Sequence, residues 1–267
     1  MNIRYLLSSS LFAGIFMSLG ILGACAKAQN PKNECCRESE ISVENNTSSE
    51  ISDSQKEINR PKKVSILGDS YSTFEGYVVP DTNLVWYKPI PKKGRPTDVT
   101  QPEQTWWQIF LDKNGYELER NNSYSGSTVC NTGYGGRDYT DQSFVTRLTN
   151  IGDPDLILVF GGTNDSWADS PMGDYVWSGW TNQQLYSYRP ATAYMISTLQ
   201  TLHPDAEIIV LINDQVKDVV KTSTAEICDH YGVEWVQLED IEKMSDHPDA
   251  KGMQQIAEQL SRKTNHK

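Results

Sequence analysis

The stretch Ile66-Leu67-Gly68-Asp69-Ser70-Tyr71 decides the fold of this chain. An apolar run from Val64 to Leu67 ends in a Gly-Asp-Ser turn, which indicates a buried strand followed by a serine hydroxyl. Open α/β sheets carry their active sites at the carboxyl ends of parallel strands. The sequence therefore predicts that Ser70 lies at such an edge, although Gly-Asp-Ser alone is also common turn chemistry.

Apolar runs and helical periodicity alternate along the rest of the chain. Five strands are predicted at 64–67, 116–120, 155–160, 207–212 and 233–238, and helices at 105–113, 143–151, 191–202, 216–231 and 251–262. Continuous apolar strands with helical crossovers are typical of a parallel sheet covered on both faces. We therefore expect one domain, 62–267, with a three-layer α/β/α fold and a mostly parallel five-stranded sheet.

Three later blocks stand near predicted strand ends or helix starts. They are Ser125-Gly126, Gly161-Gly162-Thr163-Asn164-Asp165 and His247-Pro248, and the last of them is expected to begin the final helix. With Gly-Asp-Ser, they give the order Ser, Gly, Asn, His. In this the chain resembles the SGNH subgroup of the GDSL esterase/lipase family, and the resemblance implies a flavodoxin-like SGNH hydrolase fold.

The resemblance also implies a role for each block. Ser70 matches the nucleophile, and its backbone N–H would be one donor to the oxyanion. Gly126 would supply a second N–H, and Asn164 would supply a side-chain amide. His247 matches the base that takes the Ser70 proton. The chemistry implied is acyl transfer through an acyl-enzyme, with no cofactor and no metal.

The chain departs from the family pattern at the acid that orients the histidine. The family usually has Asp three residues before the histidine, where this chain has Met244. The open alternatives are Asp240, Glu242, Asp246 and a backbone carbonyl, the last of which would make a Ser-His dyad.

The first 24 residues are typical of an export signal, with Arg4 before an apolar stretch too short to span a membrane comfortably. Leu22-Gly23-Ala24-Cys25 looks like a bacterial lipobox, which predicts that Cys25 carries lipid; cleavage near Ala28 is the alternative. Residues 25–61 are polar and are expected to form a disordered tether. The predicted location is the bacterial cell envelope, with the domain lipid-anchored and facing away from the cytoplasm.

The charge balance and the cysteines restrict the partners. The chain has 24 basic and 35 acidic residues, a net charge of −11, which argues against nucleic acid or anionic lipid and favours a neutral substrate. Cys130 and Cys228 are the cysteines within the predicted domain, and their pairing stays open, as does the oligomeric state.

Two aromatic segments, 75–104 and 166–189, interrupt the alternation and follow strand ends that carry motif residues. We expect them to wall the site and one or two of their rings to contact substrate, while the others pack the segments down. The favoured function is hydrolysis of acetyl or other short acyl esters on carbohydrate. The alternatives are a lipase, lysophospholipase or thioesterase of the same fold, and an inactive glycan-binding lipoprotein.

Overall fold

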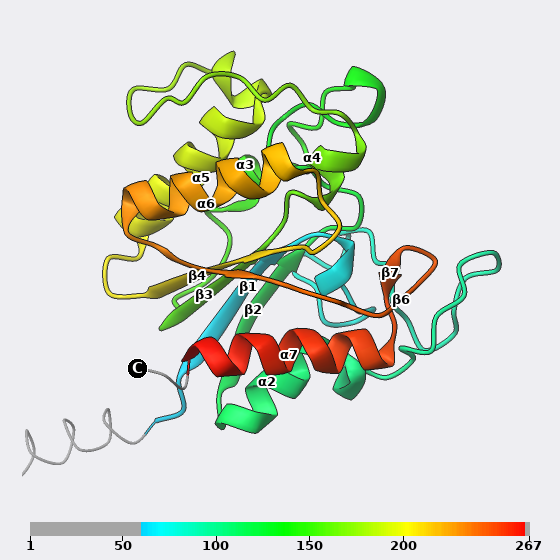
Figure 1. The fold of residues 1–267 in the computed structure, drawn as a ribbon. Helices are drawn as coiled ribbons and strands as arrows, with labels where there is room; N and C mark the ends of the chain where they lie inside the picture. The colour runs from blue at the N-terminus through cyan, green and yellow to red at the C-terminus, as the bar shows by residue number, and fades with distance from the viewer. Residues whose placement is uncertain (1–59, 265–267) are drawn as a thin grey trace, which may run out of the picture. The chain divides into compact units, whose positions relative to one another are not determined.

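The computed structural model describes residues 60–264, and its centre is one sheet of five parallel strands. The spatial order is β2-β1-β3-β4-β5 (Figure 1). The strands are β1 (Lys63–Gly68), β2 (Glu117–Ser123), β3 (Leu156–Phe160), β4 (Glu207–Ile212) and β5 (Glu234–Gln237). This is the flavodoxin-like strand order, and it confirms the predicted α/β fold.

Helices cover both faces of the sheet (Figure 1). On one face lie α2 (Trp106–Asn114) and α7 (Ala250–Thr264), and on the other α3 (Phe144–Arg147), α5 (Tyr188–Leu202) and α6 (Asp218–Tyr231). Each face has its own buried apolar core, with β3 side chains alternating between the two. The all-buried pattern of β3 follows from this double cover, because neither face of the strand meets solvent.

Crossovers that leave β1 and β3 lie on opposite faces of the sheet. The chain leaving β1 returns through α2 on one face, and the chain leaving β3 returns through α5 on the other (Figure 1). A crevice therefore opens between the carboxyl ends of these adjacent strands, which is where ligands bind in open α/β sheets. Ser70 follows β1, and the short helix α4 (Thr163–Trp167) follows β3.

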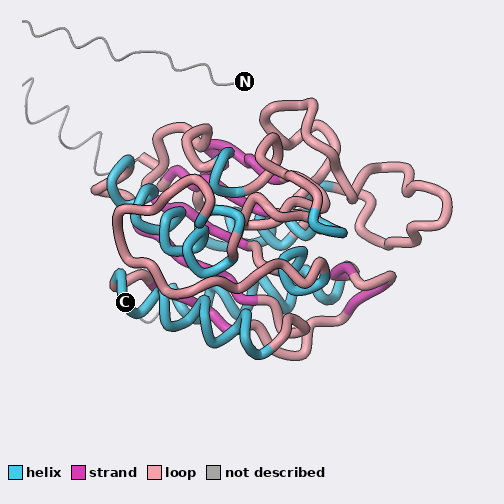
Figure 2. The backbone as a smooth tube through the Cα atoms, turned by 90° about the horizontal axis from the view of Figure 1, so that it is seen from above, coloured by secondary structure: helices cyan, strands magenta, loops and turns pink. Residues whose placement is uncertain are grey.

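Loops make up much of the domain around the sheet, and a two-stranded hairpin stands apart from it (Figure 2). The hairpin pairs β6 (Lys243–Met244) with β7 (His247–Pro248). The expectation that His247 begins the last helix is wrong. The helix α7 starts at Ala250, because the Asp249 carboxylate accepts the Gly252 N–H at 2.8 Å and so caps it.

The predicted signal peptide (1–24), the predicted tether up to residue 59, and Cys25 lie outside the described residues. Within residues 60–264, every helix is too short or too polar to cross a bilayer.

Candidate active site

Ser70 and His247 lie 177 positions apart in the chain and meet at the carboxyl end of β1. The Ser70 Oγ is 2.9 Å from Nε2 of His247. Ser70 begins a single 3₁₀ turn, Ser70–Ser72, which Asp69 caps by accepting the Tyr71 N–H at 3.0 Å. This cap fixes the turn directly after the strand, so the position of the hydroxyl follows from the end of β1.

A backbone carbonyl, and not a carboxylate, meets the other nitrogen of the His247 ring. Nδ1 is 3.0 Å from the carbonyl oxygen of Ser245, which leaves Nε2 free to accept the Ser70 proton when Nδ1 carries hydrogen. Met244 pairs with His247 across the hairpin. Of the carboxylates left open by the sequence, Glu242 binds Lys251 at 2.8 Å, and neither Asp240 nor Asp246 hydrogen-bonds to the imidazole.

Two tyrosine hydroxyls hold the residues on either side of His247. Tyr71 donates to the Asp246 carbonyl at 2.6 Å, and Tyr87 donates to the Pro248 carbonyl at 2.8 Å. Both tyrosines are fully buried. Because Tyr71 directly follows Ser70, its hydrogen bond to Asp246 ties the serine turn to the segment that carries His247.

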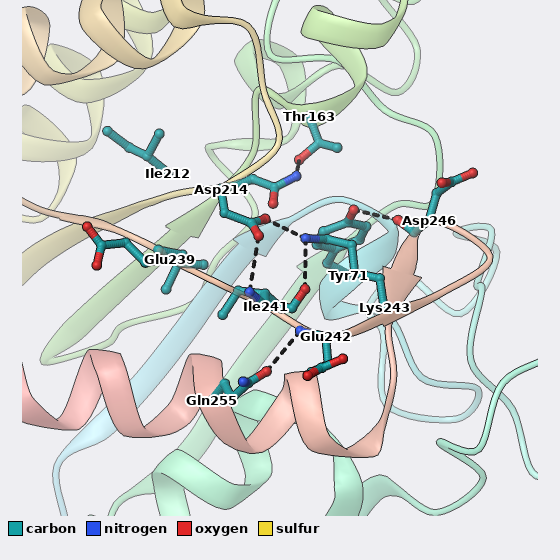
Figure 3. A network of polar contacts seen from close by, with 12 residues as sticks. Tyr71, Thr163, Ile212, Asp214, Glu239, Ile241, Glu242, Lys243, Asp246 and Gln255 are labelled. Carbon is teal, nitrogen blue, oxygen red and sulfur yellow. Dashed lines mark hydrogen bonds and ion pairs between the residues drawn. The ribbon is translucent and has the colours of Figure 1, made fainter.

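A polar network fixes the same segment to the end of β4 (Figure 3). Lys243 forms a largely buried ion pair with Asp214, and the Asp214 carboxylate also accepts the Ile241 N–H at 3.1 Å. On the far side, Gly252 allows α7 to approach closely, since a Cβ there would lie 2.0 Å from the Glu242 carbonyl oxygen. The hairpin that carries His247 is thus held from both sides.

Burial makes His247 hard to protonate. Its side chain is 6% exposed, and Trp86 stacks on the imidazole with ring centroids 3.4 Å apart and planes 2° apart. Desolvation by burial lowers the pKa of His247 to about 4, and the positive charge of Arg95 acts in the same direction. The Ser245 carbonyl and the Asp246 charge oppose the shift without cancelling it.

The two remaining predicted residues, Gly126 and Asn164, line the same cavity as Ser70 and His247. Gly126 has a φ of +89°, a conformation that favours glycine. The Asn164 Oδ1 accepts the Tyr134 hydroxyl at 2.8 Å, and this contact fixes which way the amide faces. The structure therefore brings together all four side chains and backbone groups that the sequence singled out.

Three buried charges support these loops from behind. Arg147 donates to the Gly68 carbonyl at 3.1 Å and to Ser127 Oγ at 3.0 Å, so it joins the end of β1 to the loop that carries Gly126. Asp165 accepts the backbone N–H groups of Val129 and Cys130 from that loop. Burial raises the pKa of Asp69 to about 7 and that of Asp165 to about 6, and it lowers that of Arg147 to about 9.

The cavity over Ser70 has a volume of about 660 Å³. Its aromatic lining is Trp86, Trp167 and Tyr134, and its aliphatic lining is Leu84 and Val85. Of these, Trp167 keeps 37% of its surface exposed. One ring from each of the two predicted insertions, Trp86 and Trp167, therefore reaches the site.

Most aromatic residues of 166–189 lie elsewhere. Trp177 stacks on His230 near the end of α6, with ring centroids 3.9 Å apart, and Trp180 packs edge-on against Tyr194 of α5. Neither ring lines the cavity over Ser70, and both pack the segment against the helical layer. Trp177 and Trp180 are thus among the rings that pack the segment down.

Both domain cysteines are buried and free, so the disulfide that the sequence left open is not formed. Burial raises the pKa of both thiols above the usual range, which is typical of structural cysteines and not of reactive ones. Within residues 60–264, no group of three or more His, Cys, Asp and Glu side chains is placed to hold a metal ion.

Known proteins resemble this chain over the whole described domain. The family described as GDSL-like Lipase/Acylhydrolase matches residues 62–264. A GDSL-like lipase from Bacteroides uniformis is 51% identical over 79% of this chain and 99% of its own, with a TM-score of 0.77. A second, from Bacteroides ovatus, is 49% identical over 78% and 100%, with a TM-score of 0.76.

A more distant structure shares the fold. It is a family two carbohydrate esterase from Clostridium thermocellum in complex with cellohexaose, 16% identical over 78% of this chain and 65% of its own, with a TM-score of 0.51. A comparison with curated proteins gave no match. The family match and the two Bacteroides structures establish that the chain belongs to the GDSL-like lipase/acylhydrolase family and is an ester hydrolase.

Proposed function

We propose that the protein removes acetyl or other short acyl groups from carbohydrate through a Ser70 acyl-enzyme. The observation that carries the proposal is the 2.9 Å contact between Ser70 Oγ and His247 Nε2, at the floor of a cavity that Gly126 and Asn164 also line. A nucleophile, a base and oxyanion donors are what acyl transfer needs.

The reaction follows from this geometry in two steps. Ser70 Oγ attacks the ester carbonyl while His247 Nε2 takes its proton, and the Ser245 carbonyl receives the Nδ1–H and keeps the ring in place. The Ser70 and Gly126 N–H groups and the Asn164 amide stabilise the oxyanion. His247 then protonates the leaving alcohol, and a water molecule activated by the same imidazole hydrolyses the acyl-serine.

The cavity lining favours a short acyl group and a sugar. Two aliphatic side chains, Leu84 and Val85, are too few to line a channel for a long acyl chain. The half-exposed Trp167 indole, whose ring centroid is 6.2 Å from that of His247, offers a flat face on which a sugar ring can stack.

Substrate chain length tests this proposal. On p-nitrophenyl esters we expect kcat/KM to fall at least roughly tenfold between acetate and octanoate, because each extra methylene finds little apolar surface to bury. Release of p-nitrophenol measures it, and acetate release from acetylated oligosaccharides measures the carbohydrate part. A clear preference for octanoate would support the lipase alternative instead.

The pH dependence tests the role of His247. A base must be neutral to accept a proton, and burial lowers the pKa of His247 to about 4, so it stays neutral well below pH 6.5. We expect kcat/KM to hold its plateau down to about pH 5 and to fall about tenfold per pH unit below about pH 4. Half-maximal activity near pH 6.5 would show that the imidazole is not buried during turnover.

We propose further that the protein is anchored to the cell envelope through Cys25, on the basis of the lipobox-like Leu22-Gly23-Ala24-Cys25. In a bacterial host, Cys25→Ser is expected to move the protein from the membrane fraction to the soluble fraction while kcat/KM on p-nitrophenyl acetate stays the same, because the domain begins far downstream. Fractionation and an activity assay check it. Membrane association that survives the substitution would contradict the assignment.

A further inference from the structure

Three basic side chains gather at the cavity of an otherwise acidic protein. Lys88, Lys92 and Arg95 all line it, and Asp81 is the acidic residue among the lining side chains. The whole chain carries a net charge of −11, so its average surface repels anions. The charged side chains that line the cavity are thus mostly positive, whereas the net charge of the whole chain is negative.

Two of these three cations have no carboxylate partner within the described part of the chain. Lys88 binds Glu75 at 3.2 Å, which neutralises it. Lys92 and Arg95 are exposed, and no carboxylate of residues 60–264 lies within 4.0 Å of either. Surface cations without partners are ordinary, but two of them facing one substrate cavity create a local positive potential there.

Arg95 also contacts the ring that stacks on His247. Its guanidinium carbon lies 4.7 Å from the centroid of the Trp86 ring, and the same indole stacks on His247. The contact with Trp86 holds the long Arg95 side chain over the cavity, although it leaves the guanidinium N–H groups available. An anion bound there would sit beside the sugar whose ester reaches Ser70.

We infer that the alcohol part of the substrate is an acidic sugar, whose negative group is bound by Lys92 and Arg95. The inference rests on the proposed function and adds the charge of the substrate to it. It replaces the expectation of a neutral substrate, which came from the net charge of the whole chain and not from the charge at the cavity. A guanidinium binds a carboxylate or sulfate through two parallel hydrogen bonds, and a nearby ammonium adds a point charge.

The test compares two substrates that differ in one group, using the full-length protein in detergent. Methyl glucoside and methyl glucuronoside, each monoacetylated at the same hydroxyl, are assayed by acetate release, with p-nitrophenyl acetate as an uncharged reference. We expect kcat/KM to be at least roughly fivefold higher for the glucuronoside, and this ratio to shrink in 0.5 M salt, where exposed charges are screened.

Variants assign the effect to the two residues. Lys92→Gln with Arg95→Gln is expected to bring the ratio close to one, and Arg95→Lys alone is expected to keep part of it because the charge remains. The matched control is Lys93→Gln, which removes the same charge from an exposed neighbour that does not line the cavity, and it should keep the full ratio. If the double variant disturbs the stacking of Trp86 on His247, Lys92→Gln alone is used in its place.

Four results would overturn the inference. Equal kcat/KM for the two sugars in the wild-type protein, or an unchanged ratio in the double variant, would do so and leave the esterase proposal standing. Faster hydrolysis of lysophosphatidylglycerol than of the glucuronoside would show that the cations bind a lipid phosphate. Failure to cleave p-nitrophenyl acetate and both sugars would remove the proposed function itself, and the inference with it.

Discussion

Ser70→Ala is expected to lower kcat/KM for p-nitrophenyl acetate on the order of a million-fold, the loss typical of removing the nucleophile of a serine hydrolase. The only atom removed is the Oγ that lies 2.9 Å from His247, while the cap from Asp69 to the Tyr71 backbone remains. The fold should therefore survive, and the melting temperature should show this. A fluorophosphonate probe should label the wild-type protein and not the variant.

Ser125→Ala is the matched control, because Ser125 lines the same cavity and also carries a hydroxyl, but its oxygen does not meet the imidazole. This variant should keep its labelling. Probe labelling that persists in Ser70→Ala would mean that another residue is the nucleophile.

His247→Ala should lower kcat/KM nearly as much as Ser70→Ala does, because without the imidazole nothing takes the Ser70 proton. Its Nε2 meets Ser70 directly and its Nδ1 contacts the Ser245 carbonyl, so we propose that the pair works as a dyad. Initial rates on p-nitrophenyl acetate measure the loss. A loss of less than about a hundredfold would exclude His247 as the base.

The neighbouring carboxylates supply the controls. Asp240→Asn, Glu242→Gln and Asp246→Asn should each keep kcat/KM within about threefold, because none of the three hydrogen-bonds to the ring. The Glu242–Lys251 pair is exposed, and such pairs contribute little to stability. If kcat/KM of one variant instead falls about ten-thousandfold, the substituted residue would be the acid of a triad.

The sequence predicted those parts of the fold and site that local patterns encode. Apolar runs located β1, β3 and β4, because strands buried on both faces need unbroken hydrophobic sequence. The resemblance of four short blocks to the SGNH subgroup pointed to Ser70, Gly126, Asn164 and His247, and the structure places all four at one cavity.

Contacts between distant segments could not be predicted in this way. Trp86 on His247, and the Tyr71 and Tyr87 hydroxyls on the carbonyls around it, join positions more than 150 residues apart within loops that have no periodicity. The hairpin of β6 and β7 has two residues per strand, too few for a pattern. The same hairpin explains Met244, which sits across from His247 while the chain turns back to offer the Ser245 carbonyl.

The chain enters the domain at the edge of the sheet that lies opposite the candidate site. Arg60 binds Asp155 at 2.6 Å just before β3, so the polypeptide arrives at the amino ends of the strands. Ser70 lies beyond the other end of β1, roughly 20 Å away. A long substrate that crosses the cavity mouth therefore need not approach the point where the chain enters the domain.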